Sequence, residues 1–257
     1  MLTGKAILSS LRSELDLSDY RKLHWEVTVE DYLNIVLERT DVTRTAYQRL
    51  YDMILMHGTE EVYENKDRIV RFKFFTEFAA RHGDAVYGID RPLMQLVNTF
   101  KSAARSYGTE RRVLLLHGPV GSSKSTIARL LKRGLEDYSR TDEGMLFSYA
   151  WRGETAPAQK CPMHEDPLHL VPLELRAPLL ARLNDGRKPN DFQVSIQGEL
   201  CPFCRHMFNE RLAKYDGDWN RMLDEVRIYR LILSEQDRVG IGTFQPKDEK
   251  KIGRAHV

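Results

Sequence analysis

The chain has 257 residues, enough for one large domain or two modest ones. Hydrophobic residues make up 42% of it, and the net charge of +2 is too small to indicate nucleic acid or a membrane surface as a partner. No apolar run reaches the ~20 residues that span a bilayer. The first twenty residues are mixed and charged, without the apolar centre of a signal peptide, so we expect a cytoplasmic protein.

The first 80 residues are expected to form an N-terminal helical region. Apolar residues recur at helical spacing over 31–39 and again over 43–56. The aromatic residues among them are expected to pack in a core. Residues 69–75 fit either a short strand or the start of a helix that ends near residue 81. The residues that share one face of the second helix are Tyr47, Leu50, Tyr51, Ile54 and Leu55.

A short apolar turn, Val86-Tyr-Gly-Ile-Asp90, precedes the next periodic stretch. The periodicity predicts a helix over 91–106, and Asp90 is placed to be its N-cap. An ordinary turn before an ordinary helix is the simplest interpretation of Gly88 and Ile89. A second interpretation depends on the segment that follows.

That segment is an apolar run, Val113 to Leu116, followed by a glycine-rich turn and an apolar-periodic helix over 127–135. Strand, glycine-rich turn and helix, with Lys-Ser-Thr at the junction, is the order of a phosphate-binding loop. Glycines let the backbone curl close to a phosphate, and the backbone N–H groups and the helix N-terminus attract the anion. The candidate nucleotide-binding residues are Gly118, Pro119, Val120, Gly121, Ser122, Ser123, Lys124, Ser125 and Thr126.

Two side chains of this loop carry the expected chemistry. Lys124 is the candidate catalytic residue, placed to reach the β and γ phosphates, and Ser125 is the candidate Mg²⁺ ligand. We therefore expect ATP and Mg²⁺ as cofactors. Ser123 stands where a glycine usually precedes the lysine, and a positive φ there would cost about 1 kcal/mol. The alternative is a glycine- and serine-rich connection that binds no ligand.

Residues 144–151 predict a second strand, which completes a strand–loop–helix–strand unit with a parallel sheet. The expected fold class is therefore α/β, a parallel P-loop sheet flanked by helices. Residues 152–207, rich in proline, are expected to be an insertion that contains a short helix over 173–183. From 209 to 233 the pattern is helical again, with Trp219, Met222 and Val226 on the apolar face.

All three cysteines lie in the insertion, in the pairs Cys161-Pro-Met-His164 and Cys201-Pro-Phe-Cys204. Two intervening residues let both members of a pair reach one tetrahedral ion. Cys161, His164, Cys201 and Cys204 therefore predict a structural zinc site, although the gap between the pairs is longer than in common zinc fingers. The pattern leaves two alternatives open, a redox pair at Cys201 and Cys204 and plain buried cysteines.

Five segments together resemble the AAA module of the PrkA family of bacterial serine protein kinases, over about residues 28–250. The resemblance implies an AAA-type domain over 81–250, in which Gly88 and Ile89 contact the adenine. It also implies a cytoplasmic, ATP-using enzyme that phosphorylates Ser or Thr of a protein substrate and serves stress or sporulation physiology. The segments are Tyr87–Asp90, Gly118–Thr126, Cys161–Leu168, Gly198–Cys204 and Val239–Lys250.

The catalytic acid of such an enzyme is not evident. Asp224 and Glu225, the only Walker-B candidates, lie on a helical pattern and are rejected, and the catalytic motifs of eukaryotic-type kinases are absent. An AAA+ unfoldase or protease component, or a nucleotide-gated interaction module, therefore stays open beside the kinase. The resemblance ends inside the module and residues 251–257 continue no pattern. We thus expect a fragment with a foreign tail, weak phosphoryl transfer, and an open sheet edge that favours association of copies.

Overall fold

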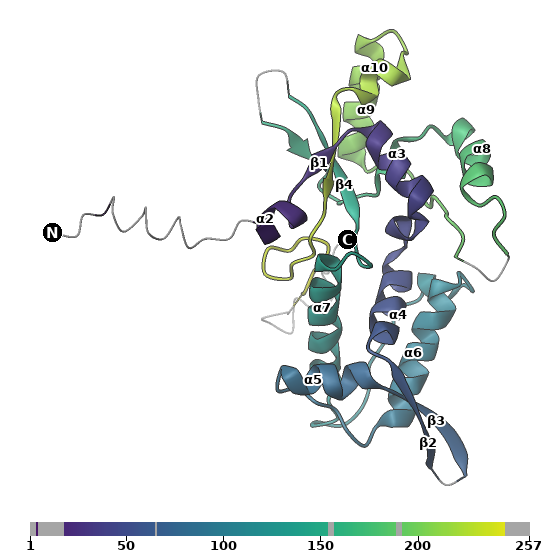
Figure 1. The fold of residues 1–257 in the computed structure, drawn as a ribbon, viewed down its shortest axis with the longest axis vertical. Helices are drawn as coiled ribbons and strands as arrows, with labels where there is room; N and C mark the ends of the chain where they lie inside the picture. Colours follow the sequence, from purple (N-terminus) through teal and green to yellow (C-terminus); the bar gives the residue numbers. More distant parts are fainter. Residues whose placement is uncertain (1–3, 5–17, 65, 154–156, 189–191, 245–257) are drawn as a thin grey trace, which may run out of the picture. The chain divides into compact units, whose positions relative to one another are not determined.

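The computed structural model describes residues 4, 18–64, 66–153, 157–188 and 192–244 (Figure 1). They form two compact units, and each unit is made of several separate stretches of the chain. The sheet unit comprises 18–35, 147–172 and 198–231, and the helical unit comprises 36–146, 173–197 and 232–244. This division differs from a boundary near residue 80, because residues on both sides of that point share one core. No helix of the described part is long and apolar enough to cross a membrane.

In the helical unit, α4 (Ala46–Met56) packs against α6 (Asp90–Ala104) and α7 (Lys124–Arg140). The sequence starts α4 with a capping box: Thr45 N donates to Gln48 Oε1 at 2.8 Å, and Gln48 N donates to Thr45 Oγ1 at 3.5 Å. Such a box satisfies two N–H groups that the first helical turn leaves unpaired. The helix expected over 43–56 is therefore confirmed.

The core of this unit joins segments far apart in the sequence. Its rings contact one another, as Phe74 and Phe78 do with centroids 5.0 Å apart. Gly134 lets α7 approach closely, because a Cβ there would lie 2.7 Å from Met53 Sδ and 2.7 Å from the Phe74 ring. The buried core residues are Met53, Ile54, Phe72, Phe74, Phe75, Phe78, Ala79, Val86, Leu93, Val97, Phe100, Ile127, Leu130 and Tyr138.

A β-hairpin interrupts the region that the sequence suggests to be helical. Strands β2 (Thr59–Glu64) and β3 (Asp67–Phe72) pair antiparallel, with Val62 opposite Ile69, and β3 also packs against α6 (Figure 1). The strand interpretation of 69–75 is therefore right for its first half. The remaining elements of the unit are η1 (Thr40–Thr43), η2 (Lys73–Phe75), α5 (Glu77–Arg81), η3 (Thr109–Arg111) and α8 (Leu173–Leu183), the last as expected.

The sheet unit is built on four antiparallel strands in the order β1-β6-β4-β5. The two central strands, β6 (Val226–Arg230) and β4 (Phe147–Trp151), are buried almost along their whole length. The other elements are β1 (Glu26–Val27), β5 (Gln159–Lys160), α2 (Ser18–Leu23), α3 (Val29–Glu38), which runs on into the helical unit, η4 (Pro167–Leu170), α9 (Pro202–Lys214) and α10 (Trp219–Leu223).

This topology corrects two expectations. Val113–Leu116 is not a strand: within the described ranges nothing pairs with it, and Val113 and Leu115 are 95% and 84% exposed. A strand needs a neighbour to satisfy its backbone groups, so the parallel P-loop sheet is not formed, and the α/β content contains antiparallel sheets. The helical interpretation of 209–233 is wrong for its last part, because Val226–Arg230, in which Val226 and Ile228 are β-branched, pairs with β4.

Candidate phosphate-binding site

The glycine-rich loop folds tightly before α7. Gly121 and Ser123 both have left-handed backbones, with φ of 84° and 58°. Glycine adopts this conformation freely, but a serine does so at a cost. The positive φ considered for Ser123 is thus present. Ser122 Oγ donates to Pro119 O at 2.8 Å and holds the turn.

The Lys124 ammonium lies against this loop. Its Nζ donates to Gly118 O at 2.8 Å, to Pro119 O at 2.5 Å and to Ser122 Oγ at 2.9 Å. The positive charge is therefore held where the loop curls back on itself, with neutral oxygens as partners. Phosphate oxygens would be stronger acceptors for the same ammonium.

The N-terminus of α7 adds to this positive character. The helix has 17 residues, and the side chain of its N-cap residue, Ser123, accepts no hydrogen bond from the first turn. First-turn N–H groups that lack a side-chain cap are natural anion ligands. Ser125 follows in this turn with an exposed side chain, and Thr126 is partly exposed. The arrangement can bind a phosphate chain together with its cation.

The turn around Gly88 is linked to the same helix. Arg129 of α7 forms two hydrogen bonds with Asp84, at 3.0 Å and 2.5 Å, and this arginine lowers the pKa of the Asp84 carboxyl. Gly88 has φ of 77°, and Ile89 packs against the core. Gly88 and Ile89, the predicted adenine contacts, therefore follow closely after Asp84, which is hydrogen-bonded to α7.

Asp90 does not have the predicted capping role. It lies inside α6, whose N-cap is Ile89, and the Ile89 side chain makes no capping hydrogen bond. The Asp90 carboxylate instead accepts two hydrogen bonds from Arg71, at 3.1 Å and 2.9 Å. A bidentate arginine satisfies both carboxylate oxygens, so this acid braces the hairpin against α6.

The predicted zinc ligands lie in the sheet unit. Donor atoms of Cys161, Cys201, Cys204 and Glu165 lie within 4.8 Å of one another, and the three cysteines are free and buried. His164 is not part of this group; its backbone is left-handed, and its Nδ1 is buried without a hydrogen-bond partner. The structure thus brings three of the four predicted residues together and adds Glu165, which the spacing within the two pairs did not select.

The rejected Walker-B candidates lie between α10 and β6. The Glu225 carboxylate forms ion pairs with Arg211 and Lys214, both at 2.8 Å. It belongs to the sheet unit, whereas the phosphate-binding loop belongs to the helical unit. A carboxylate held by two cations is a structural anchor, which agrees with the rejection of this residue.

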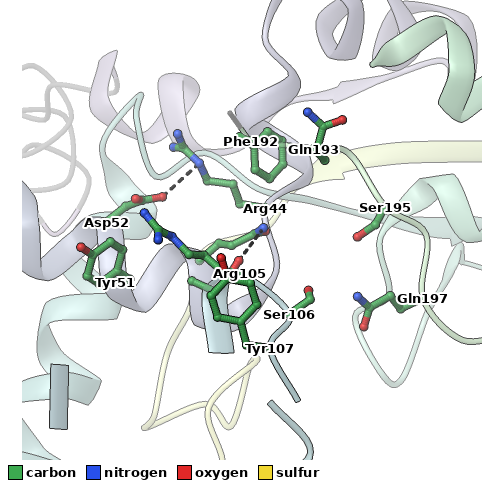
Figure 2. A pocket seen from close by; sticks show the side chains of 12 residues that line it. Arg44, Tyr51, Asp52, Arg105, Ser106, Tyr107, Phe192, Gln193, Ser195 and Gln197 are labelled. Atoms are coloured by element: carbon green, nitrogen blue, oxygen red, sulfur yellow. Dashed lines mark hydrogen bonds and ion pairs between the residues drawn. The ribbon is translucent and has the colours of Figure 1, made fainter. Parts of the chain in front are cut away.

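A cavity of about 510 Å³ lies in the helical unit (Figure 2). Arg44 is paired with Asp52 at 3.0 Å and lies 5.6 Å from the centroid of the Phe192 ring. No single sequence motif marks this cavity, because α4, the end of α6 and the segment after residue 191 each contribute to it. Residues 118–126 do not line it, so it is distinct from the phosphate-binding loop. The lining residues are Arg44, Gln48, Tyr51, Asp52, Ala104, Arg105, Ser106, Tyr107, Phe192, Gln193, Ser195 and Gln197.

A glycine-rich loop that opens a helix with Lys-Ser-Thr defines the P-loop class of nucleotide-binding proteins. The family model of the PrkA AAA domain matches residues 27–255. The chain belongs to this family, whose AAA-type domains use ATP.

Two curated proteins from bacilli are similar to the chain. The "ATP-dependent protease PrkA" of Bacillus subtilis (strain 168) is 34% identical over 231 residues, which cover 90% of this chain and 31% of that protein. An "Uncharacterized protein in gldA 5'region" of Geobacillus stearothermophilus is 30% identical over 108 residues, 42% of this chain and 98% of that protein. The chain thus spans about a third of the length of the Bacillus protein. No solved structure matches.

Proposed function

We propose that this chain binds MgATP at Gly118–Thr126 and is the nucleotide-binding part of an enzyme that uses ATP to act on proteins. The observation that carries the proposal is the shape of the loop. Left-handed Gly121 and Ser123 fold it tightly, with the Lys124 ammonium against it and the N-terminus of α7 behind it. A tight loop that carries an ammonium group next to a helix N-terminus supports the binding of a polyphosphate.

Each group of the loop has a defined part in this proposal. The backbone N–H groups hold the phosphate chain, and Lys124 exchanges neutral carbonyl partners for charged phosphate oxygens. Ser125 would ligate the magnesium ion, which supplies positive charge to the β and γ phosphates. Gly88 and Ile89 would contact the adenine. The loop alone does not define what happens to the γ-phosphate.

Two uses of ATP are candidates. The family resemblance to serine protein kinases supports transfer of the γ-phosphate to a protein Ser or Thr. The Bacillus subtilis relative is named an ATP-dependent protease, and this name supports the second candidate, ATP hydrolysis that drives work on a protein chain. Both require the same phosphate-binding loop, so only the fate of the phosphate separates them.

The experiment follows γ-labelled ATP with casein as the protein probe, on this chain and on the full-length Bacillus subtilis protein. Label on casein supports the kinase, whereas free labelled phosphate together with casein peptides supports the protease. Lys124→Ala, and the equivalent change in the relative, should abolish either activity. Lys101→Ala removes the same charge from α6 and should leave activity unchanged. If the full-length relative does neither, the proposed action on proteins is wrong.

A further inference from the structure

A cluster of three buried cysteines and one partly buried glutamate lies in the sheet unit, outside the phosphate-binding loop. Cys161 and Glu165 lie in the turn after β5, and Cys201 and Cys204 lie at the start of α9. Cys161 and Cys204 are fully buried, and Cys201 is 8% exposed. Nothing in the nucleotide chemistry above uses these groups.

The four donor atoms are spaced for one metal ion. They all lie within 4.8 Å of one another. Around tetrahedral zinc, with bonds of roughly 2.0–2.3 Å, ligand atoms are separated by about 3.5–4 Å. The observed spacing is therefore within about 1 Å of what one tetrahedral ion requires.

Each sulfur accepts an N–H hydrogen bond. Glu165 N donates to Cys161 Sγ at 3.4 Å, and Cys204 N donates to Cys201 Sγ at 3.4 Å. The Trp151 indole donates to Cys204 Sγ at 3.5 Å. N–H donors stabilise a thiolate more than a thiol, and the thiolate is the form that binds metals. Each of the three sulfurs thus has one N–H donor that favours its metal-binding form.

The Glu165 carboxylate is held by a backbone N–H group and by a tyrosine hydroxyl. Its Oε1 accepts from Cys201 N at 2.8 Å, and its Oε2 accepts from the Tyr149 hydroxyl at 3.0 Å. The Cys161 thiol also donates to Oε2, at 3.4 Å. Metal-ligating carboxylates are oriented by such outer hydrogen bonds. A partly buried carboxylate beside three buried thiols also gains from a cation, because part of its hydration is lost in this position.

We propose that Cys161, Glu165, Cys201 and Cys204 bind one zinc ion, with Glu165 rather than His164 as the fourth ligand. Four protein ligands leave no open position for water, so the site is structural. The ion joins the turn after β5 to the start of α9. One of these two segments precedes residues 173–197, which belong to the helical unit, and the other follows them. The ion therefore links the two parts of the sheet unit that this stretch separates in the sequence.

The test compares metal binding by wild type, Glu165→Gln and His164→Asn. Glutamine keeps the shape of Glu165 but removes its charge, and asparagine tolerates the left-handed backbone at position 164 while removing the imidazole. Elemental analysis should find about one zinc in wild type and in His164→Asn. Cobalt titration of the metal-free proteins should show thiolate-to-cobalt absorption in both, with at least about 10-fold weaker binding in Glu165→Gln.

Three results would overturn the proposal. Loss of metal in His164→Asn, with tight binding kept in Glu165→Gln, would assign the fourth ligand to the histidine. Wild type without metal and with a Cys201–Cys204 disulfide by mass spectrometry would show a redox pair. Wild type without metal, and without cobalt absorption on titration, would show plain buried cysteines. Circular dichroism of each variant separates lost ligation from lost folding, and the two conservative variants remain informative if cysteine variants do not fold.

Discussion

Substitution of Ser123 by glycine measures the backbone strain in the phosphate-binding loop. Its backbone has φ of 58° and ψ of 14°, a left-handed conformation that costs a non-glycine residue about 1–2 kcal/mol. Ser123→Gly removes that cost but gives the unfolded chain more freedom, which is worth about 0.4–1 kcal/mol against folding. The expected net result is a gain of up to about 1.6 kcal/mol in the free energy of unfolding, with a central value of about 0.8 kcal/mol.

The matched control is Ser102→Gly, the same chemical change inside the right-handed helix α6. It should lower the free energy of unfolding by about 0.5–1 kcal/mol, because nothing offsets the flexibility of glycine there. The assay is urea unfolding followed by far-UV circular dichroism. Tryptophan fluorescence reports a different part, since Trp25, Trp151 and Trp219 all lie in the sheet unit. If Ser123→Gly destabilises as much as Ser102→Gly, the loop is not strained at this position.

Two further variants test contacts that stabilise the helical unit. Arg49 is buried, and its guanidinium donates to the carbonyl oxygens of Val42 and Gly144, so Arg49→Met should lower the free energy of unfolding by about 3–5 kcal/mol. A loss below about 1 kcal/mol in urea unfolding would contradict this role. Arg129 lowers the pKa of Asp84, so the carboxylate stabilises the fold above about pH 4 and loses that effect as the pH falls further. Asp84→Asn should therefore be less stable than wild type at pH 7 and lose less stability towards pH 3, whereas equal losses would refute the linkage.

The helices could be predicted where one signal dominates the sequence. α4 carries an apolar face and a capping box, and α8 was predicted with both of its ends. Strand β6 could not be predicted in this way. Met222, Val226 and Tyr229 have helical spacing, whereas Val226 and Ile228 alternate as in a strand. Pairing with β4 decides between the two patterns, and such tertiary context is absent from a local pattern.

The strand prediction for the apolar run before the loop was wrong for a related reason. Val113–Leu116 has the composition of a buried strand, but a strand forms only where another strand pairs with it. The hairpin β2–β3 was missed because its strands carry many charged residues, such as Glu60 and Arg71, which face each other across the ladder. Composition alone does not reveal that pairing.

The candidate sites show the same contrast. The tight turn before α7 could be predicted, because its groups are consecutive and its shape follows from glycine and serine backbones, whereas phosphate binding by each of its residues stays a prediction. The cysteines were also predictable from their spacing. Glu165 was not, because it is adjacent to the expected ligand His164 and only the turn after β5 decides which of the two side chains faces the sulfurs.

MgATP binding at the loop is tested most directly by calorimetric titration of wild type, Lys124→Ala and Lys101→Ala. Lys124→Ala removes a charge-assisted contact with phosphate worth about 1.5–3 kcal/mol, which corresponds to about 10- to 100-fold weaker binding. Lys101→Ala should bind as wild type does, because this lysine lies in the last turn of α6, outside the loop. Equal affinity in all three proteins, or no binding by wild type, would contradict the assignment of Gly118–Thr126 as the nucleotide site.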